Sequence, residues 1–269
     1  MEKGKSEFRF KKEFGQNFIF DTVFLTEMVK DLGLDKSSNI LEIGAGMGTL
    51  TEVLAKNFKR VVSFEIDKTL TEKLSVIKEK FSNLEIVLSD ILRVKTQEID
   101  ELFKGEKYDI VANIPYNITS QIVFKFLLES ERLEKMFIMV QKEVGERFVA
   151  SKSTSEYGIP SVILSTFGSC KMVKQVPRKM FVPVPRVDSC VVVIEKIDDK
   201  FGSFDKEKYE RFVSSCFAMK RKKLLNNLIK MGKDKQTILR TFEEMSLDEN
   251  TRPENLSSKE YVQLFRILG

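Results

Sequence analysis

The sequence has no histidine, no tryptophan and only three cysteines among its 269 residues. Without histidine, catalysis by Ser-His or Cys-His pairs is excluded, so any acid or base chemistry falls to carboxylates, lysine or tyrosine. The cysteines, Cys170, Cys190 and Cys216, are far apart along the chain. They are too few and too scattered for a zinc site in a chain without histidine, so we expect no metal.

Long apolar runs are also missing. No stretch approaches the roughly 18 uncharged apolar residues of a membrane helix. The N-terminal residues 1–12 mix charged residues with others and do not form the apolar centre of a signal peptide. We therefore expect a soluble, cytoplasmic protein without a membrane partner. With 42% hydrophobic residues, the chain is long enough for one sizeable core and a smaller second unit.

Basic residues gather in two places, although the net charge is only +5. Residues 171–186 include five basic residues and no acidic residue, and Lys220–Lys223 is an unbroken basic run. Two basic patches on a nearly balanced chain indicate a polyanionic partner, while a solvated helix face would explain the second patch equally well. The candidate RNA-binding residues are Arg178, Lys179, Arg186, Lys220, Arg221, Lys222 and Lys223.

Short apolar runs with the length of buried strands alternate with helical segments in most of the chain. The runs are 39–43, 61–64, 84–88, 108–112, 136–140 and 190–194. This alternation predicts an α/β fold with a Rossmann-like, largely parallel sheet and helices on both faces. After Lys196 only helical periodicity remains, so we predict a catalytic domain at 1–198 and a small all-helical domain at 199–269. One helix is expected to run from Lys206 through Lys223, leaving part of the basic run exposed.

A glycine-rich turn, Gly44–Gly48, follows the first apolar run and precedes a helical segment. Such turns let the backbone approach a ligand closely, and G-x-G-x-G differs from the G-x-G-x-x-G of dinucleotide loops. Glu65 ends the next strand, where an acid can accept hydrogen bonds from ribose hydroxyls. Asp90 follows the third strand, where it can accept from the amine of an adenine. Each acid alone is more often a solvated loop carboxylate, but together they favour an adenosine-bearing cofactor.

The segment Asn113–Tyr116, with sequence Asn-Ile-Pro-Tyr, follows the run 108–112. It should lie at the carboxyl edge of the sheet, where open α/β proteins bind ligands. Asn113 offers a side-chain oxygen as an acceptor. Proline has no N–H, so the carbonyl of Ile114 can be aimed at a ligand without local competition. With the aromatic face of Tyr116, this combination suits a planar amine, whereas an isolated tetrapeptide of this kind is usually an ordinary turn.

A second segment with restricted backbone lies farther along the chain. Pro183 and Pro185 alternate with valines and force extended backbone. The segment cannot be helical, and it should hold Phe181 rigidly near a neighbouring strand end.

Together these motifs resemble a known family. They are Gly15–Phe18, Glu42–Gly48, Asn113–Asn117 and Phe181–Pro185, in the order and context of the S-adenosylmethionine-dependent ribosomal RNA adenine N6-dimethyltransferases. The resemblance is best to the KsgA/Dim type, which modifies small-subunit rRNA. The run Lys220–Leu228 is similar to the C-terminal domain of that type, whereas the Erm macrolide-resistance dimethylases share the catalytic motifs but not this tail. Ile19 stands where leucine is usual.

The resemblance implies an enzyme that uses S-adenosyl-L-methionine to dimethylate two adjacent adenosines in the loop of the 3′-terminal helix of small-subunit rRNA during ribosome assembly. The implied partner is that RNA within a pre-ribosomal particle, and we expect a monomer. The implied catalytic residues are Asn113, Ile114, Pro115, Tyr116 and Phe181. The implied cofactor-binding residues are Gln16, Asn17, Ile19, Gly44, Gly46, Glu65, Ile66, Asp90, Ile91 and Asn113.

Two other functions stay open on the sequence alone. One is a nicotinamide-dependent dehydrogenase, which the glycine spacing and the amide-proline-aromatic motif disfavour. The other is a ribosome-assembly or transcription factor that keeps the fold only to bind RNA, against which the complete set of motifs argues.

Overall fold

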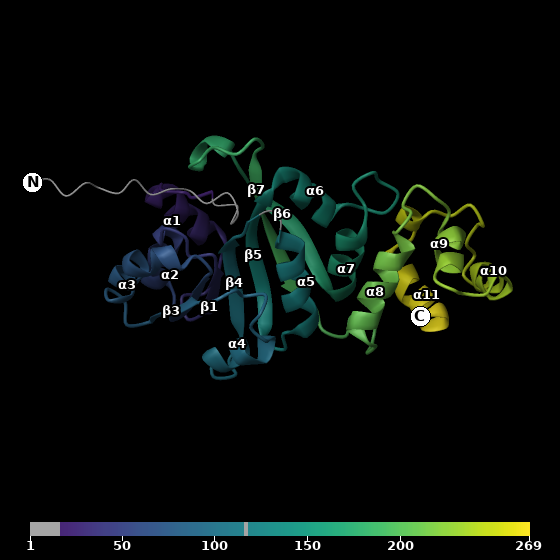
Figure 1. The fold of residues 1–269 in the computed structure, drawn as a ribbon, viewed down its shortest axis with the longest axis horizontal. Coiled ribbons are helices and arrows are strands. Elements are labelled where there is room, and N and C mark those ends of the chain that lie inside the picture. Colours follow the sequence, from purple (N-terminus) through teal and green to yellow (C-terminus); the bar gives the residue numbers. More distant parts are fainter. Residues whose placement is uncertain (1–16, 116–117) are drawn as a thin grey trace, which may run out of the picture.

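The structure is a computed structural model that describes residues 17–115 and 118–269. Its described strands form one sheet in the order β3-β2-β1-β4-β5-β7-β6 (Figure 1). The strands are β1 (Asn39–Ile43), β2 (Arg60–Glu65), β3 (Leu84–Leu88), β4 (Tyr108–Asn113), β5 (Leu133–Gln141), β6 (Gly168–Val176) and β7 (Ser189–Lys196). Strands β1 to β5 are parallel, and β7 is antiparallel to both β5 and β6. The predicted, largely parallel sheet is confirmed.

Helices flank this sheet, and the C-terminal region is helical throughout. The helices before residue 198 are α1 (Thr22–Asp31), α2 (Thr49–Asn57), α3 (Thr71–Lys78), α4 (Thr96–Leu102), α5 (Thr119–Glu129), α6 (Lys142–Val149) and α7 (Ile159–Phe167). They are followed by α8 (Lys206–Cys216), α9 (Leu224–Lys230), α10 (Lys235–Glu244) and α11 (Ser258–Leu268). No helix in the described ranges has the length and apolar character that a membrane span requires.

Alternate residues of the strands contribute to two separate apolar cores. On β4, Ile110 and Ala112 join a core with α4, α5 and α7, whereas Val111 between them joins a second core with α1, α2 and α3. A strand buried on both faces requires apolar residues at successive positions, because successive side chains point to opposite faces. The continuous apolar runs of the sequence are therefore explained by helices on both sides of the sheet, as predicted.

The core on the α7 side continues into the C-terminal helices, because α8 and α11 both pack on α7. The ring of the buried Tyr209 on α8 meets Phe167 edge-on, with the ring centroids 5.7 Å apart. Its hydroxyl lies 2.9 Å from Thr166 Oγ1, which gives this buried polar group a partner. The predicted boundary after residue 198 falls in the turn between β7 and α8, and the division into two domains stays a prediction.

Capping side chains determine where helices α1 and α11 begin. Asp21 accepts a hydrogen bond from the Phe24 N–H at 3.0 Å at the start of α1. At the start of α11, Ser257 Oγ accepts from the Glu260 N–H at 3.3 Å, and Glu260 accepts in return from the Ser257 N–H at 2.7 Å. These bonds satisfy N–H groups that have no partner within the helix.

The structure corrects the continuous helix that we expected over 206–223. Helix α8 ends at Cys216, and a turn leads to α9, which begins at Leu224. The buried Asn227 holds this turn, because its Oδ1 accepts from the Met219 N–H at 2.9 Å and its Nδ2 donates to the Met219 carbonyl at 3.4 Å. Backbone groups that a longer helix would pair internally are thus satisfied by one side chain.

The apolar residues of this segment pack inward in spite of the break. Those buried are Phe212, Val213, Cys216, Phe217, Leu224 and Leu228. The basic run 220–223 lies on the turn itself, where Arg221, Lys222 and Lys223 are exposed.

A buried carboxyl group lies in the sheet beneath the glycine-rich turn. Glu42 on β1 has no exposed surface, and its Oε2 accepts from Thr51 Oγ1 at 2.7 Å and from Ser63 Oγ at 2.5 Å. No described residue provides a hydrogen bond to its Oε1. Burial raises the pKa of Glu42 to about 7, against the lowering effect of these two hydrogen bonds. One carboxyl group thereby links β1, α2 and β2.

Replacing Asn227 should destabilise the protein through the turn that it holds. Asn227→Ala leaves the Met219 N–H without its partner, so the free energy of unfolding should fall by about 1–3 kcal/mol in chemical denaturation. Asn226→Ala is the matched control, because Asn226 is exposed, and it should change stability far less. Equal stability of the two variants would contradict the assigned role of Asn227.

The pKa of Glu42 predicts a pH-dependent loss of stability. Between the ordinary carboxyl pKa of 4.5 and the folded-state value of about 7, the folded protein keeps a proton that the unfolded chain releases. The free energy of unfolding should therefore fall as the pH rises from 5 to 8, by up to roughly 3 kcal/mol relative to Glu42→Gln, which cannot ionise. Denaturation at several pH values measures this difference. Glu79→Gln, at an exposed position, should keep the wild-type profile.

Candidate active site

The glycine-rich turn approaches the end of β2 closely. Gly44 and Gly46 have φ of +85° and +54°, a left-handed backbone conformation that favours glycine. The Gly46 N–H donates to Glu65 Oε2 at 2.7 Å. A Cβ atom at Gly46 would lie 2.6 Å from Cε1 of the Phe18 ring, so a side chain there has no room. The backbone conformation explains glycine at both positions, and the packing against Phe18 adds a second reason at Gly46.

The carboxyl ends of β1, β2, β3 and β4 meet at one edge of the sheet and enclose a cavity. It contains about 760 Å³ of space, which includes open solvent at its mouth. The lining residues are Asn17, Phe18, Ile43, Gly44, Gly46, Phe64, Glu65, Ile66, Ser89, Asp90, Ile91, Asn113, Ile114, Pro115 and Ile118. Eight of the ten predicted cofactor-binding residues are among them; Ile19 is not, and Gln16 lies outside the described residues.

Glu65 is nearly buried at the end of β2, where both carboxylate oxygens accept hydrogen bonds from the backbone. Oε2 accepts from Gly46, and Oε1 accepts from the Asp67 N–H at 2.8 Å. Burial raises the pKa of Glu65, and the backbone hydrogen bonds oppose that rise. Because each carboxylate oxygen has two lone pairs, the backbone bonds leave acceptor capacity for a hydroxyl group in the cavity.

Asp90 follows β3 and is held by the loop that it begins. Its Oδ1 accepts from the Leu92 N–H at 3.0 Å, and its Oδ2 lies 3.4 Å from Arg93 Nε. The side chain is 27% exposed and lines the cavity, so it can also accept from a ligand N–H. The two acids predicted at the strand ends are therefore brought to one cavity.

Asn113 is the last residue of β4 and lines the same cavity. Its Nδ2 donates to the backbone carbonyl of Asn17 at 2.9 Å, so Oδ1 is the end of the amide that remains to accept from a ligand. Ile114 is buried, and the Pro115 carbonyl accepts from the Ile118 N–H at 3.2 Å in the turn that leads into α5. Tyr116 lies outside the described residues.

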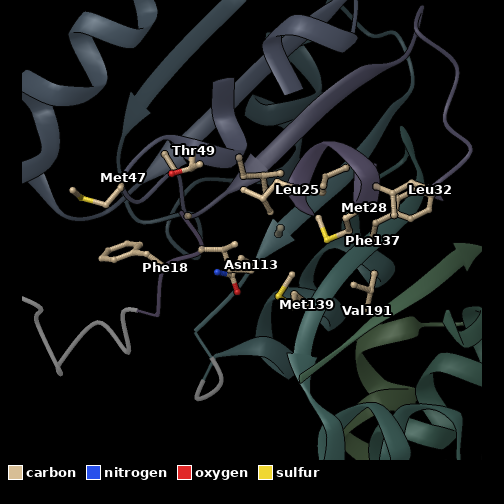
Figure 2. Close-up of a pocket in the computed structure, with 16 residues that line it drawn as sticks. Phe18, Leu25, Met28, Leu32, Met47, Thr49, Asn113, Phe137, Met139 and Val191 are labelled. Carbon is tan, nitrogen blue, oxygen red and sulfur yellow. The ribbon is translucent and has the colours of Figure 1, made fainter. Parts of the chain in front are cut away.

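A second, smaller cavity opens on the other side of Asn113, between α1 and the sheet (Figure 2). Figure 2 shows Asn113 between the ring of Phe18 and the apolar side chains of Met139 and Val191. Ile19 lines this second cavity rather than the first. Phe18 lines both, and our sequence interpretation named its neighbours but gave it no role in the site.

Phe181 lies close to this region, but its ring is inside the core of the α1 side and has no exposed surface. Next to it, the backbone of Val182 pairs with that of Phe18 in an antiparallel bridge. The aromatic face of Phe181, which a base would need for stacking, is therefore covered in this structure. The role of Phe181 in catalysis stays a prediction.

The predicted RNA-binding residues form two separate groups outside the cavity. Arg178, Lys179 and Arg186 are exposed between β6 and β7, where Arg178 Nη1 donates to the Arg186 carbonyl at 3.0 Å. On the turn between α8 and α9, Lys220 Nζ donates to the Ser155 carbonyl at 2.6 Å, which ties the basic run to the loop between α6 and α7. Figure 1 shows the β6–β7 segment and α9 in different parts of the molecule.

Sequence relatives match this chain over nearly its full length. A protein of Bacillus mycoides named ribosomal RNA small subunit methyltransferase A is 37% identical, and the alignment covers 98% of this chain and 93% of that protein. A protein of the same name from Bacillus cytotoxicus is 36% identical with the same coverage.

Solved structures share the fold. A dimethyladenosine transferase from Plasmodium falciparum matches with a TM-score of 0.75 at 24% identity, covering 92% of this chain and 95% of that one. The 23S rRNA methyltransferase ErmE matches with a TM-score of 0.67 at 25% identity, covering 94% of this chain and 99% of that one. Residues 199–269 are too many to be left out of a match of this extent, so the C-terminal helices alone do not distinguish small-subunit from large-subunit enzymes.

The model of one protein family, ribosomal RNA adenine dimethylase, matches residues 7–269. This match, the full-length relatives, and the glycine turn, strand-end acids and strand-end amide around one cavity agree with one another. The chain belongs to the ribosomal RNA adenine dimethylase family.

Proposed function

We propose that this protein is an S-adenosyl-L-methionine-dependent adenine N6-dimethyltransferase that modifies two adjacent adenosines in the 3′-terminal loop of small-subunit rRNA. The observation that carries the proposal is the arrangement around one cavity: Glu65 and Asp90 on one side and the Asn113–Pro115 segment on the other. The acids suit an adenosine-bearing cofactor, and the amide suits the amine that receives the methyl group. The methyltransferases named above as relatives support the substrate class.

The described residues fit the proposed cofactor. Glu65 can accept from the ribose hydroxyls, and Asp90 can accept from the adenine amine. Gly44 and Gly46 have no side chains that would keep a ligand from the backbone, and the apolar Ile66 and Ile91 flank the cavity. When bound, the cofactor supplies a methyl group on a sulfonium sulfur, and the neutral thioether that remains is an excellent leaving group.

The target amine needs orientation more than it needs a base. Adenine N6 is a poor nucleophile, because its lone pair is delocalised into the ring. Hydrogen bonds from its two N–H groups to Asn113 Oδ1 and the Ile114 carbonyl would localise that lone pair. Because the product loses its extra proton readily after transfer, catalysis is chiefly alignment, which is worth up to roughly 7–11 kcal/mol. The absence of histidine is compatible with such a reaction.

An adenine within an RNA loop must leave its stack to reach this cavity, at a cost of a few kcal/mol. Aromatic stacking returns about 1–3 kcal/mol per contact, and Tyr116 and Phe181 are the proposed partners. Because the ring of Phe181 is buried, its contribution requires the segment after β6 to move.

The two basic groups are the proposed RNA surface. Contacts from Arg178, Lys179, Arg186 and the run 220–223 to phosphates would position the RNA without reading its bases. We propose that the substrate is an unmodified pre-ribosomal particle in the cytoplasm, on which the protein acts as a monomer.

Methyl transfer to unmodified small-subunit particles should depend on S-adenosyl-L-methionine and on Asn113. Asn113→Ala should lower the single-turnover rate by at least about a hundredfold, because it removes a preorganised hydrogen-bonding group. Its affinity for the cofactor should fall much less. Radiolabelled methyl incorporation measures the rate, and calorimetry measures the affinity.

Two outcomes would contradict this proposal. Methylation confined to naked large-subunit RNA would assign the protein to the large-subunit enzymes. Binding of NAD but not of S-adenosyl-L-methionine in the same calorimeter would favour a dehydrogenase.

Removing two charges from the basic run should weaken RNA binding. Arg221→Ala with Lys222→Ala should lower affinity for small-subunit RNA and reduce the salt dependence, log K against log salt, by about one per lost phosphate contact. Cofactor affinity should stay unchanged. Lys73→Ala with Lys78→Ala is the charge-matched control, because these exposed lysines lie on α3, at the opposite end of the molecule from α9 (Figure 1). An equal loss of RNA affinity in both double variants would mean that only the net charge of the protein matters, and not the position of the basic run.

A further inference from the structure

Residues 17 and 18 contact three separate parts of the site. The Asn17 carbonyl accepts from Asn113 Nδ2 at 2.9 Å. The Phe18 N–H donates to the Val182 carbonyl at 2.9 Å, and the Val182 N–H donates to the Phe18 carbonyl at 2.8 Å. The ring of Phe18 lies against Gly46. Two adjacent residues therefore join the strand-end amide, the segment after β6 and the glycine-rich turn.

The bond to Asn17 determines which end of the Asn113 amide faces a ligand. An asparagine side chain has an acceptor at one end and two donor hydrogens at the other. While Nδ2 donates to the Asn17 carbonyl, Oδ1 is presented to an amine. If the amide turned over, Oδ1 would face the Asn17 carbonyl, where two acceptors meet without a hydrogen, and Nδ2 would meet the amine with the wrong polarity. Each inverted contact forfeits a hydrogen bond.

Phe18 fixes the position of that carbonyl. Its two backbone bonds to Val182 set the direction of the chain directly after Asn17. Its ring sets the distance from the glycine-rich turn, because a Cβ atom on Gly46 would lie 2.6 Å from Cε1 and 2.9 Å from Cδ1 of the ring. Figure 2 shows the ring beside Asn113 at the edge of the apolar cavity. A shift of Phe18 therefore moves the carbonyl group on which the amide orientation depends.

We propose that Phe18 is a positioning residue, which acts through the Asn17 carbonyl to orient the Asn113 amide toward the target amine. The proposal rests on the proposed function only in taking that amine as the ligand of Asn113. Its structural part, the control of the amide by Phe18, is independent of any substrate. It also gives the glycine-rich turn and the segment after β6 a common contact, because the ring of Phe18 meets one and its backbone meets the other.

The test compares Phe18→Ala and Phe18→Leu with Phe20→Ala. Phe20 is the matched control: it is an aromatic residue of the same segment, it is 45% exposed, and its ring centroid lies 6.2 Å from that of Phe18. Two quantities are measured in each full-length variant. One is the single-turnover rate of methyl transfer to unmodified small-subunit particles at saturating S-adenosyl-L-methionine. The other is the solvent exchange rate of the Asn113 side-chain amide by NMR without substrate, with the signal assigned by its loss in Asn113→Ala.

Phe18→Ala should slow methyl transfer about tenfold and speed exchange of the Asn113 amide about tenfold, the effect expected from losing one hydrogen bond. Phe18→Leu retains bulk against the glycine-rich turn and should recover most of both. Phe20→Ala should match the wild type in both. Val182→Pro removes the N–H that donates to Phe18 without deleting a core side chain, since Val182 is 44% exposed, and it should also speed exchange.

Unchanged exchange of the Asn113 amide in both Phe18→Ala and Val182→Pro would overturn the proposal. A full rate of methyl transfer in Phe18→Ala at saturating cofactor would also overturn it, because the orientation of the target amine would then not depend on Phe18. A wild-type protein that methylates no ribosomal particle would instead defeat the proposed function. In that case the exchange rates still decide whether Phe18 orients Asn113.

Discussion

The in-register parallel pairing of β1, β2 and β4 is the constraint on which the site depends. Ile43 of β1 pairs with Phe64 of β2 and with Ala112 of β4. The residues that follow these three are the first glycine of the turn, Glu65 and Asn113, which therefore emerge side by side at one edge. A slip of one residue in any pairing would turn the following side chain to the opposite face of the sheet. The sheet rather than the loops thus fixes how Glu65 and Asn113 lie relative to each other.

Buried polar groups connect the elements next to this edge of the sheet. Their burial carries a desolvation penalty that apolar side chains would avoid. Glu42 is desolvated completely, and its pKa is raised to about 7, yet its carboxyl group joins Thr51 of α2 and Ser63 of β2 to β1. The glycine-rich turn spans the same strand and helix. A leucine at this position would remove the desolvation penalty but also the bonds that fix the start of α2. Local violations of the rule that cores are apolar are expected where a site needs a defined geometry.

The strands, and the strand-end residues that line the cavity, could be predicted from the sequence, because their signals are local. The runs 39–43 and 84–88 match β1 and β3 to the residue, since each is a short, mainly apolar segment of the length of a strand. The turn after α8 could not be predicted, because it is held by hydrogen bonds from the Asn227 side chain to the backbone of Met219, and no local sequence pattern indicates these bonds. Phe18 pairs with Val182 far along the chain, and no local pattern reports such a contact. The burial of Phe181 was missed for the same reason, because the proline pattern defines its backbone but not what packs on its ring.

The absence of histidine and the hydrogen bond that orients the Asn113 side chain have a common explanation. In the proposed reaction, transfer of a methyl group from a sulfonium to an amine needs little proton chemistry, so the protein would gain most from holding the amine in one orientation. An asparagine serves that purpose only if its two ends are distinguished, because the oxygen accepts and the nitrogen donates. The bond from Asn113 Nδ2 to the Asn17 carbonyl makes that distinction. In the proposed mechanism, which uses no histidine, catalysis depends on the hydrogen bond that orients this amide.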